Sequence, residues 1–224
     1  MTPFMRKVLA IVAKDVASEL RTREALSSMF VFALLVIVIF NFAFELRVDN
    51  KGAVAPGAPW VAIVFAGMLG LNRSFITEKD RGCLEGLLLC PVDRSAIFAG
   101  KMVGNLLFMG AVEAVLLPVF AAFFDLPVFT PRLLLIVALG TLGFAAVGTL
   151  FAAVAVHTRT REVMLPVLLL PVAVPVLVAA VKATGDALAS PPPLMEGPWL
   201  GILVAFDVIF VTAAMLTFEY VFQE

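Results

Sequence analysis

One short segment has the residue types and spacing of a surface that binds another protein. It follows a charged stretch and becomes apolar at Leu84, Leu87 and Leu88, which share one face at helical spacing. The apolar turn stops at Pro91. An exposed apolar turn needs a covering partner, and a helix laid into the groove of another protein is a common mode of recognition. The alternative is a segment that folds back onto a lipid bilayer.

Two acidic residues, Glu113 and Asp207, lie within long apolar runs. A carboxylate at the centre of a membrane helix costs on the order of 2.5–3.5 kcal/mol on insertion scales, so such residues usually face a protein interior or a water-filled cavity. One interpretation is a hydrogen bond between helices, or protonation caused by desolvation. The other is a role in a transport pathway, and the sequence favours neither. The single histidine, His157, is interpreted as a polar interface group rather than as a ligand.

Another apolar run contains three prolines, Pro166, Pro171 and Pro175. Each proline removes a backbone hydrogen bond and clashes with the preceding turn. The run therefore predicts one of two structures. The first is a helix broken within the membrane, as in the working elements of transporters, and the second is a plain kink that fixes packing.

The sequence contains no motif for catalysis or nucleotide binding. The nearest approach to a phosphate-binding loop is Gly100-Lys101-Met102, which lacks both the upstream glycine and the hydroxyl residue. The metalloprotease, nucleophile-elbow and dinucleotide motifs are absent as well. Cys83 and Cys90 match neither a disulfide framework nor a metal or redox motif. We therefore predict a protein that is not an enzyme, has no metal site and depends on a partner for any energy that it uses.

The composition indicates which elements position these residues. Of 224 residues, 62% are hydrophobic and 15% are charged, whereas ordinary soluble domains have about 45–50% and about 25%. The mean hydropathy is +1.07. These values exclude a soluble fold and a disordered chain. A net charge of −1 gives no indication of a nucleic-acid partner.

Six apolar runs are long enough to cross a bilayer as helices, and the alternating pattern of a membrane β-barrel is absent. The runs are Leu26–Phe44, Ala53–Leu71, Met102–Phe124, Leu133–Val156, Val163–Val181 and Trp199–Phe218. We therefore predict an all-α integral membrane protein with six transmembrane helices.

Lysine and arginine are distributed unevenly between the two sides that six spans define. With both ends of the chain inside, twelve of these residues lie in inner segments and four in outer segments. This bias predicts that both ends are cytoplasmic. Trp60 and Trp199 open their spans on the predicted outer side, where membrane proteins carry belts of aromatic residues.

Residues 1–25 precede the first span and are predicted to form an amphipathic helix on the anionic cytoplasmic membrane surface, while residues 26–224 form the transmembrane domain. The apolar arc of this helix consists of Phe4, Val8, Ile11, Val12, Val16 and Leu20, and the opposite arc is basic. Asp15 and Glu19 lie inside the apolar arc. Either they pair with neighbouring Lys or Arg at the surface, or they face protein rather than lipid.

An amphipathic N-terminal helix, six spans and a short coupling helix after the second span resemble the permease subunits of ABC-2 type exporters. More narrowly, the chain resembles the haem exporter B family, CcmB, of cytochrome c maturation. Four stretches carry the likeness. They are Lys14-Asp15 with Glu19-Leu20-Arg21-Thr22-Arg23-Glu24, Leu84-Glu85-Gly86-Leu87-Leu88-Leu89-Cys90-Pro91, Gly140-Thr141-Leu142-Gly143-Phe144, and the proline-rich fifth span. Together they cover nearly the whole chain.

The resemblance implies a homodimer in the bacterial inner membrane, bound to two copies of a CcmA-like cytosolic ATPase that carries the ATP and Mg. It also implies membrane partners that resemble CcmC and CcmD and a periplasmic haem chaperone that resembles CcmE. Haem is then held on these partners, and no cofactor is expected on this chain. ATP hydrolysis is expected to drive haem export or the release of haem-loaded chaperone.

The coupling segment is expected at residues 77–100. The residues expected at the ATPase interface are Arg81, Leu84, Glu85, Leu87, Leu88 and Asp93, with Asp15, Glu19 and Arg21 bracing the N-terminal helix against that subunit. Two alternatives remain for the function. One is an ABC-2 permease that exports a lipid, a drug or a polysaccharide, and the other is a membrane scaffold that transports nothing.

Overall fold

A computed structural model describes residues 3–47, 55–80, 86, 92–124, 126–156, 158, 161–189 and 197–221. Residues 81–85 and 87–91 of the predicted coupling segment lie outside these ranges, and they include Arg81, Leu84, Glu85, Leu87 and Leu88. His157 and both cysteines lie outside them as well.

The described residues form seven helices and no strand. The helices are α1 (Pro3–Thr22), α2 (Glu24–Arg47), α4 (Gly57–Asp80), α6 (Arg94–Phe124), α7 (Pro131–Ala155), α8 (Arg161–Leu188) and α9 (Trp199–Val221). Within these ranges, every helix except α1 is long and apolar enough to cross a membrane. The predicted all-α fold with six transmembrane helices is therefore confirmed, and the chain is a multi-pass membrane protein.

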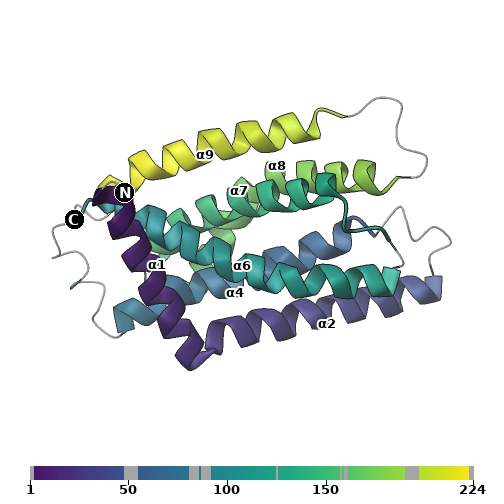
Figure 1. Cartoon of the computed structure of the whole chain (residues 1–224), viewed down its shortest axis with the longest axis horizontal. Helices are drawn as coiled ribbons and strands as arrows, with labels where there is room; N and C mark the ends of the chain where they lie inside the picture. The colour runs from purple at the N-terminus through teal and green to yellow at the C-terminus, as the bar shows by residue number, and fades with distance from the viewer. Residues whose placement is uncertain are drawn as a thin grey trace.

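The six spanning helices run side by side along the long axis, and α1 crosses one end of the bundle (Figure 1). The start of α2, the end of α4, the start of α6 and the end of α9 lie at this same end. Because the number of spans is even, the two ends of the transmembrane domain lie on one side. We refer to this side as the α1 end.

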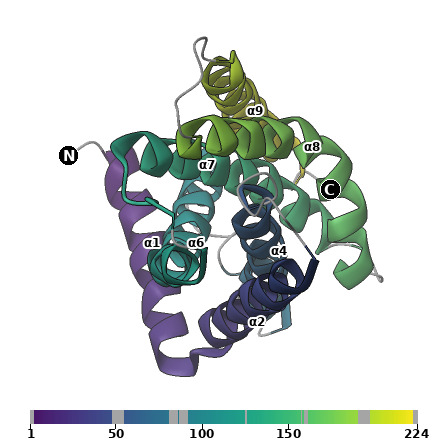
Figure 2. The same ribbon diagram turned by 90° about the vertical axis from the view of Figure 1, so that its right-hand side faces the viewer.

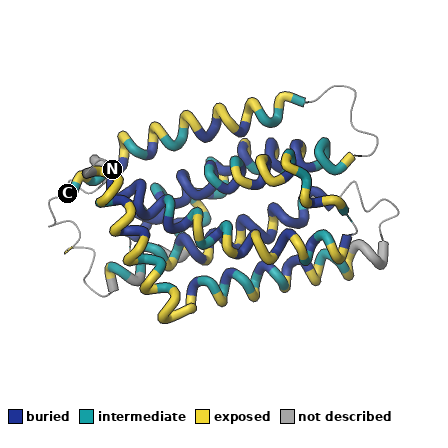
Figure 3. The backbone as a smooth tube through the Cα atoms, viewed as in Figure 1, coloured by how far each residue is buried: buried dark blue, intermediate teal, exposed yellow. Residues whose placement is uncertain are grey.

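Helix α7 forms the centre of the bundle. It packs against α4, α6, α8 and α9, and the end-on view shows it between these neighbours (Figure 2). In the most apolar stretch of α7, 67% of the residues are buried, compared with 28% in that of α2 and 22% in that of α9. The outward faces of α2 and α9 are correspondingly exposed (Figure 3), as expected for surfaces that contact lipid.

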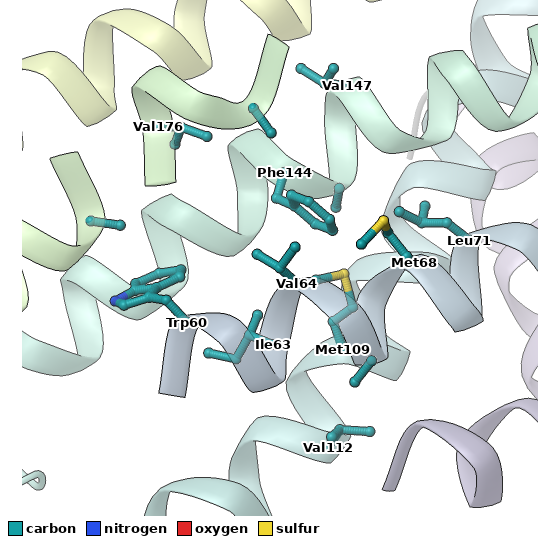
Figure 4. Packing of buried hydrophobic residues seen from close by; sticks show 14 of the residues in the cluster. Trp60, Ile63, Val64, Met68, Leu71, Met109, Val112, Phe144, Val147 and Val176 are labelled. Atoms are coloured by element: carbon teal, nitrogen blue, oxygen red, sulfur yellow. The ribbon is translucent and has the colours of Figure 1, made fainter. Parts of the chain in front are cut away.

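Helices α4 and α7 approach closely because glycine replaces larger residues where their side chains meet. A Cβ atom at Gly140 would lie 2.2 Å from the Trp60 ring, and one at Gly148 would lie 2.4 Å from Leu71 Cδ1. Figure 4 shows Trp60 and Leu71 within this packing. Trp60 is 2% exposed and donates a hydrogen bond from Nε1 to Thr184 Oγ1 at 3.0 Å. It therefore belongs to the core, which corrects its predicted place in an aromatic belt.

Helix α8 distinguishes between the two structures predicted for the prolines, a broken helix and a plain kink. It is one continuous α-helix from Arg161 to Leu188, with Pro166, Pro171 and Pro175 inside it. The prolines are spaced by five and four residues, so each turn loses at most one donor and keeps its other hydrogen bonds. The helix is therefore not broken within the membrane, unlike the discontinuous helices of transporters.

Helix α1 has the predicted amphipathic character, but part of its apolar arc faces protein. Val8 and Val12 are buried against Ala96 and Ala99 at the start of α6. Leu20, predicted for the same arc, is 60% exposed. The lipid-facing assignment is therefore wrong for the middle of the helix, because the first turns of α6 present an apolar surface to it. This contact also explains why α6 begins at Arg94, eight residues before the predicted span.

A sharp corner joins α1 to α2. Arg23 has φ = 54°, a left-handed conformation that often ends a helix, and its N–H donates to the carbonyl of Glu19 at 2.6 Å. Glu19 Oε1 accepts a hydrogen bond from the backbone N–H of Leu26 at 2.8 Å. This N–H in the first turn of α2 would otherwise have no helical partner. Glu19 therefore fixes the angle between the two helices.

Candidate functional site

A lysine is buried where α1, α4 and α6 meet. Lys101 of α6 is 1% exposed. Its Nζ lies 3.0 Å from Asp15 Oδ2 and 2.9 Å from Glu78 Oε1, and it donates to the carbonyl of Ser74 at 3.1 Å. An ammonium group has three donors, so this geometry uses all of them. The ring of Phe75 lies 5.4 Å from the same nitrogen and adds a cation–π contact.

A second lysine completes the cluster. Lys14 Nζ lies 3.2 Å from Asp15 Oδ1 and pairs with Glu78 Oε1. Each lysine therefore contacts both carboxylates, and the four formal charges cancel. We call Lys14, Asp15, Glu78 and Lys101 the charged joint, because they tie α1 to the end of α4 and to the start of α6.

The electrostatics of the charged joint favour its ionised form. Burial alone would raise the pKa of Glu78, but the charge of Lys101 and the hydrogen bonds from Lys14 and Lys101 outweigh it, so the pKa lies below the usual value. Burial likewise acts to lower the pKa of Lys14, and the hydrogen bond and charge of Glu78 together with Asp15 raise it overall. Both residues are therefore charged near neutral pH.

The joint forms one wall of a cavity of about 260 Å³. The other walls come from the start of α2 and from α4, where Glu24 and Arg73 form an ion pair at the surface. Glu78 Oε2 is buried and has no hydrogen-bond partner among the described residues. The site combines charge, burial and space at the α1 end.

The structure places the predicted interface residues in different surroundings. Asp15 belongs to the charged joint, so it pairs with its neighbour Lys14 and also faces protein. Glu19 fixes the helix corner, whereas Arg21 is exposed. Asp93, which directly precedes α6, is exposed. Its Oδ2 lies 3.4 Å from Nζ of Lys7 in α1.

Sequence reasoning missed the importance of Lys101 and Glu78. In the sequence, Lys101 stands out only as the lysine of a defective phosphate loop, and Glu78 belongs to the charged stretch before Leu84. One signal was available, because Lys101 directly precedes the apolar part of its helix and Glu78 follows the apolar part of the preceding one. Charges at two adjacent helix ends on one side of a membrane can meet, although the sequence does not show that they do.

The two intramembrane acids have different partners. Glu113 of α6 accepts a hydrogen bond from the Thr141 hydroxyl of α7. Asp207 of α9 is 5% exposed, and neither of its carboxylate oxygens has a hydrogen-bond partner within the described ranges. Its carboxylate lies beside Gly143, where a Cβ atom would come within 2.5 Å of Oδ1. The structure thus brings each acid to α7 but does not bring the two acids together at one site.

The arrangement at the α1 end joins helices through ion pairs. Its charged groups are paired with one another, and together they hold three helices at fixed positions. Two of these helices, α4 and α6, flank the predicted coupling segment in the sequence.

Comparison with known proteins identifies relatives of the whole chain. Residues 6–221 match the CcmB protein family. The chain is 29% identical to heme exporter protein B of Pseudomonas aeruginosa over 206 residues, which is 92% of each chain. It is 29% identical to the protein of the same name from Haemophilus influenzae, over 91% of each chain. For that of Rhodobacter capsulatus the identity is 26%, over 84% of this chain and 89% of the relative. Because the family match extends over nearly every residue and includes all seven helices, the chain belongs to the CcmB family.

Proposed function

We propose that this chain is the permease subunit of an ABC transporter for cytochrome c maturation. In this function, ATP hydrolysis by a CcmA-like partner is coupled to haem export or to the release of haem-loaded periplasmic chaperone. The observation that carries the proposal is the family match over residues 6–221, to which relatives named heme exporter protein B add support. The charged joint supplies a physical route for the coupling.

The coupling route begins at the segment between α4 and α6. Leu84, Leu87 and Leu88 bind the ATPase, with Arg81 and Glu85 beside them in the sequence and Asp93 at the start of α6. A displacement of this segment moves the ends of α4 and α6. Because Asp15 pairs with Lys101 of α6 and Lys14 pairs with Glu78 of α4, α1 moves with them. The interface residues of α1, including Arg21, then follow the ATPase.

The assembly that this function requires has several parts. The chain forms a homodimer in the inner membrane with both ends in the cytoplasm, and each copy contacts one ATPase that carries ATP and Mg. Partners that resemble CcmC, CcmD and CcmE hold the haem. This chain holds no ATP, metal or haem of its own, and it binds no nucleic acid. The positive residues at the α1 end favour this orientation.

A deletion strain tests the proposed function. Loss of this chain should abolish holo-cytochrome c while haem-loaded chaperone accumulates. If haem loading of the chaperone is lost instead, the chain takes part in haem export itself. Normal maturation of cytochrome c in the deletion strain would contradict the proposal and favour an ABC-2 exporter of a lipid, a drug or a polysaccharide.

Substitutions in the coupling segment test the ATPase contact. Leu87→Asp with Leu88→Asp should release the ATPase, because each leucine contributes about 1.5–3 kcal/mol when fully buried. The matched control is Leu89→Asp, which adds a charge in the same turn but off the shared apolar face. Co-purification of the ATPase measures the result. If the double variant co-purifies the ATPase with unchanged yield, the coupling helix lies elsewhere. If Glu85→Gln leaves the rate of ATP hydrolysis by the ATPase unchanged, the result favours a scaffold that transports nothing.

A further inference from the structure

The cavity beside the charged joint has the size of a small polar group. Its volume of about 260 Å³ corresponds to roughly eight or nine water molecules, since each occupies about 30 Å³ in the liquid. Complete small-molecule sites are larger, at about 300–1,000 Å³. The cavity therefore suits the polar part of a molecule whose remainder lies outside it.

The walls of the cavity are partly charged and partly apolar. Charged residues of α1, α2, α4 and α6 line it together with Ala25, Gly70 and Phe108. A lining of both kinds suits an amphiphile of the adjacent membrane leaflet, which has a charged head group and apolar chains.

The charges of the lining favour a zwitterion. Three cations, Lys14, Arg73 and Lys101, stand against four acids, Asp15, Glu19, Glu24 and Glu78. An anionic head group would therefore meet a net negative wall. A head group with an ammonium and a phosphate could contact both kinds of residue at once.

The outer charges of the lining are available for exchange. Arg73 and Glu24 pair with each other, but their side chains are 47% and 68% exposed. Exposed ion pairs contribute only about 0–1 kcal/mol, so a ligand that offers both charges can replace the pair at little cost. Asp15, Glu78 and Lys101 of the joint are only 12%, 11% and 1% exposed, and they remain bonded to one another.

We propose that this cavity binds the head group of an aminophospholipid, such as phosphatidylethanolamine, from the leaflet at the α1 end. The phosphate contacts Arg73, and the ammonium donates hydrogen bonds to Glu24 and Glu19. The acyl chains leave along Phe108 toward the bilayer. The bound lipid would occupy the space between α1 and α2, and so hold α1 at its angle to the bundle.

Binding to purified full-length protein tests this site directly. Native mass spectrometry in detergent can compare phosphatidylethanolamine, phosphatidylglycerol and phosphatidylcholine of identical chains. Phosphatidylethanolamine should bind best, because phosphatidylglycerol lacks the cation and phosphatidylcholine has no N–H donor on its nitrogen. Mono- and dimethylated phosphatidylethanolamine should bind with decreasing affinity. Equal affinity across the series would overturn the proposal.

Variants of the cavity mouth locate the binding. Glu24→Gln with Arg73→Gln should lower the affinity for phosphatidylethanolamine about tenfold, since two charge-assisted contacts are lost. The matched control is Asp186→Asn with Lys182→Gln, which makes the same charge changes near the far end of α8. Unchanged affinity in the mouth variant, or an equal loss in the control, would overturn the assignment. The assay contains no ATPase or haem, so its outcome is separate from that of the proposed function.

Discussion

At the scale of single residues, Lys101 depends on partners from two other helices. A buried ammonium is costly to desolvate, and removing one partner of a buried ion pair destabilises a protein by about 3–5 kcal/mol. The ion pairs with Asp15 and Glu78 together offset this desolvation cost. The sequence alone did not identify either residue as a partner of Lys101. Periodicity reports which face of one helix is apolar. It carries no information about which distant charges that face will contact.

The charged joint should make stability depend on pH in the acid range. The folded-state pKa of Glu78 lies below its usual value of 4.5, so its contribution to stability is complete above that value and is lost as pH falls through the folded pKa. The midpoint of thermal unfolding in detergent should therefore fall in acid. Glu78→Gln should make this acid limb shallower, and an identical limb in the variant would contradict the role of Glu78.

The basic limb has the opposite sign. The pKa of Lys14 is raised above its usual value of 10.5, so its contribution is present below that value and is lost as pH rises through the folded pKa. Glu78→Gln leaves Asp15 as a partner of Lys14, and the variant should therefore change the acid limb more than the basic limb.

Gly143 provides the space that Asp207 occupies. In Gly143→Ala, the added methyl group would lie 2.5 Å from Asp207 Oδ1 and 3.0 Å from the Phe206 ring. Overpacking of this kind costs about 1–3 kcal/mol, so α9 should dock less stably on α7. Unfolding in detergent measures the loss. Gly201→Ala on α9 is the control, because a Cβ atom there meets nothing within 4 Å, and an equal effect of both substitutions would argue against the close contact.

At the scale of elements, the existence of each spanning helix followed from its apolar length, but its partners did not. The hydrophobic pattern of α1 is the same whether Val8 and Val12 face lipid or α6, because both surroundings are apolar. Trp60 likewise is of a residue type that is common in membrane belts. It is a core residue here because its N–H donates a hydrogen bond to Thr184 of α8. For α8, the three prolines were compatible with a broken helix or with a plain kink. Continuity depends on their spacing and on packing that only the folded bundle provides.

The docking of α1 on α6 should respond to a single methyl group. A Cβ atom in Gly100→Ala would lie 2.8 Å from Ile11 Cβ and Cγ2, so α1 should separate from α6. Hydrogen exchange of the α1 amides should then become faster. Adding Ile11→Ala removes the opposing atoms and should restore part of the protection. Equal exchange in the wild type and in Gly100→Ala would mean that α1 does not rest on α6 at this point.

At the scale of the whole molecule, the distribution of charge in the sequence matches the arrangement of the helices. The Lys and Arg residues predicted which segments lie on the inner side, and the structure brings α1, the end of α4 and the start of α6 to the same end of the bundle (Figure 1). The number of spans was predictable because each span has its own apolar length. The contacts that join the spans come from residues far apart in the chain and required the structure.

Labelling of cysteine tests the orientation of the whole bundle. Cys83 and Cys90 follow α4 in the sequence, so they are expected on the cytoplasmic side. An impermeant thiol reagent should fail to label them in intact cells and should label at least one of them in inside-out vesicles. The matched control is a single cysteine at Lys182, near the opposite end of α8, which should be labelled in intact cells. The reverse pattern would overturn the orientation.

The charged joint also imposes an order in time on the biosynthesis of this protein. Asp15 is synthesised 86 residues before Lys101, which is a delay of about 4–17 s at a rate of about 5–20 residues per second. During that interval two spans are already made, but α1 has no α6 on which to rest. The apolar side of α1 can meanwhile lie on the lipid surface. The apolar side of α1 thus contacts lipid first and α6 afterwards. The change of partner follows the synthesis of Lys101.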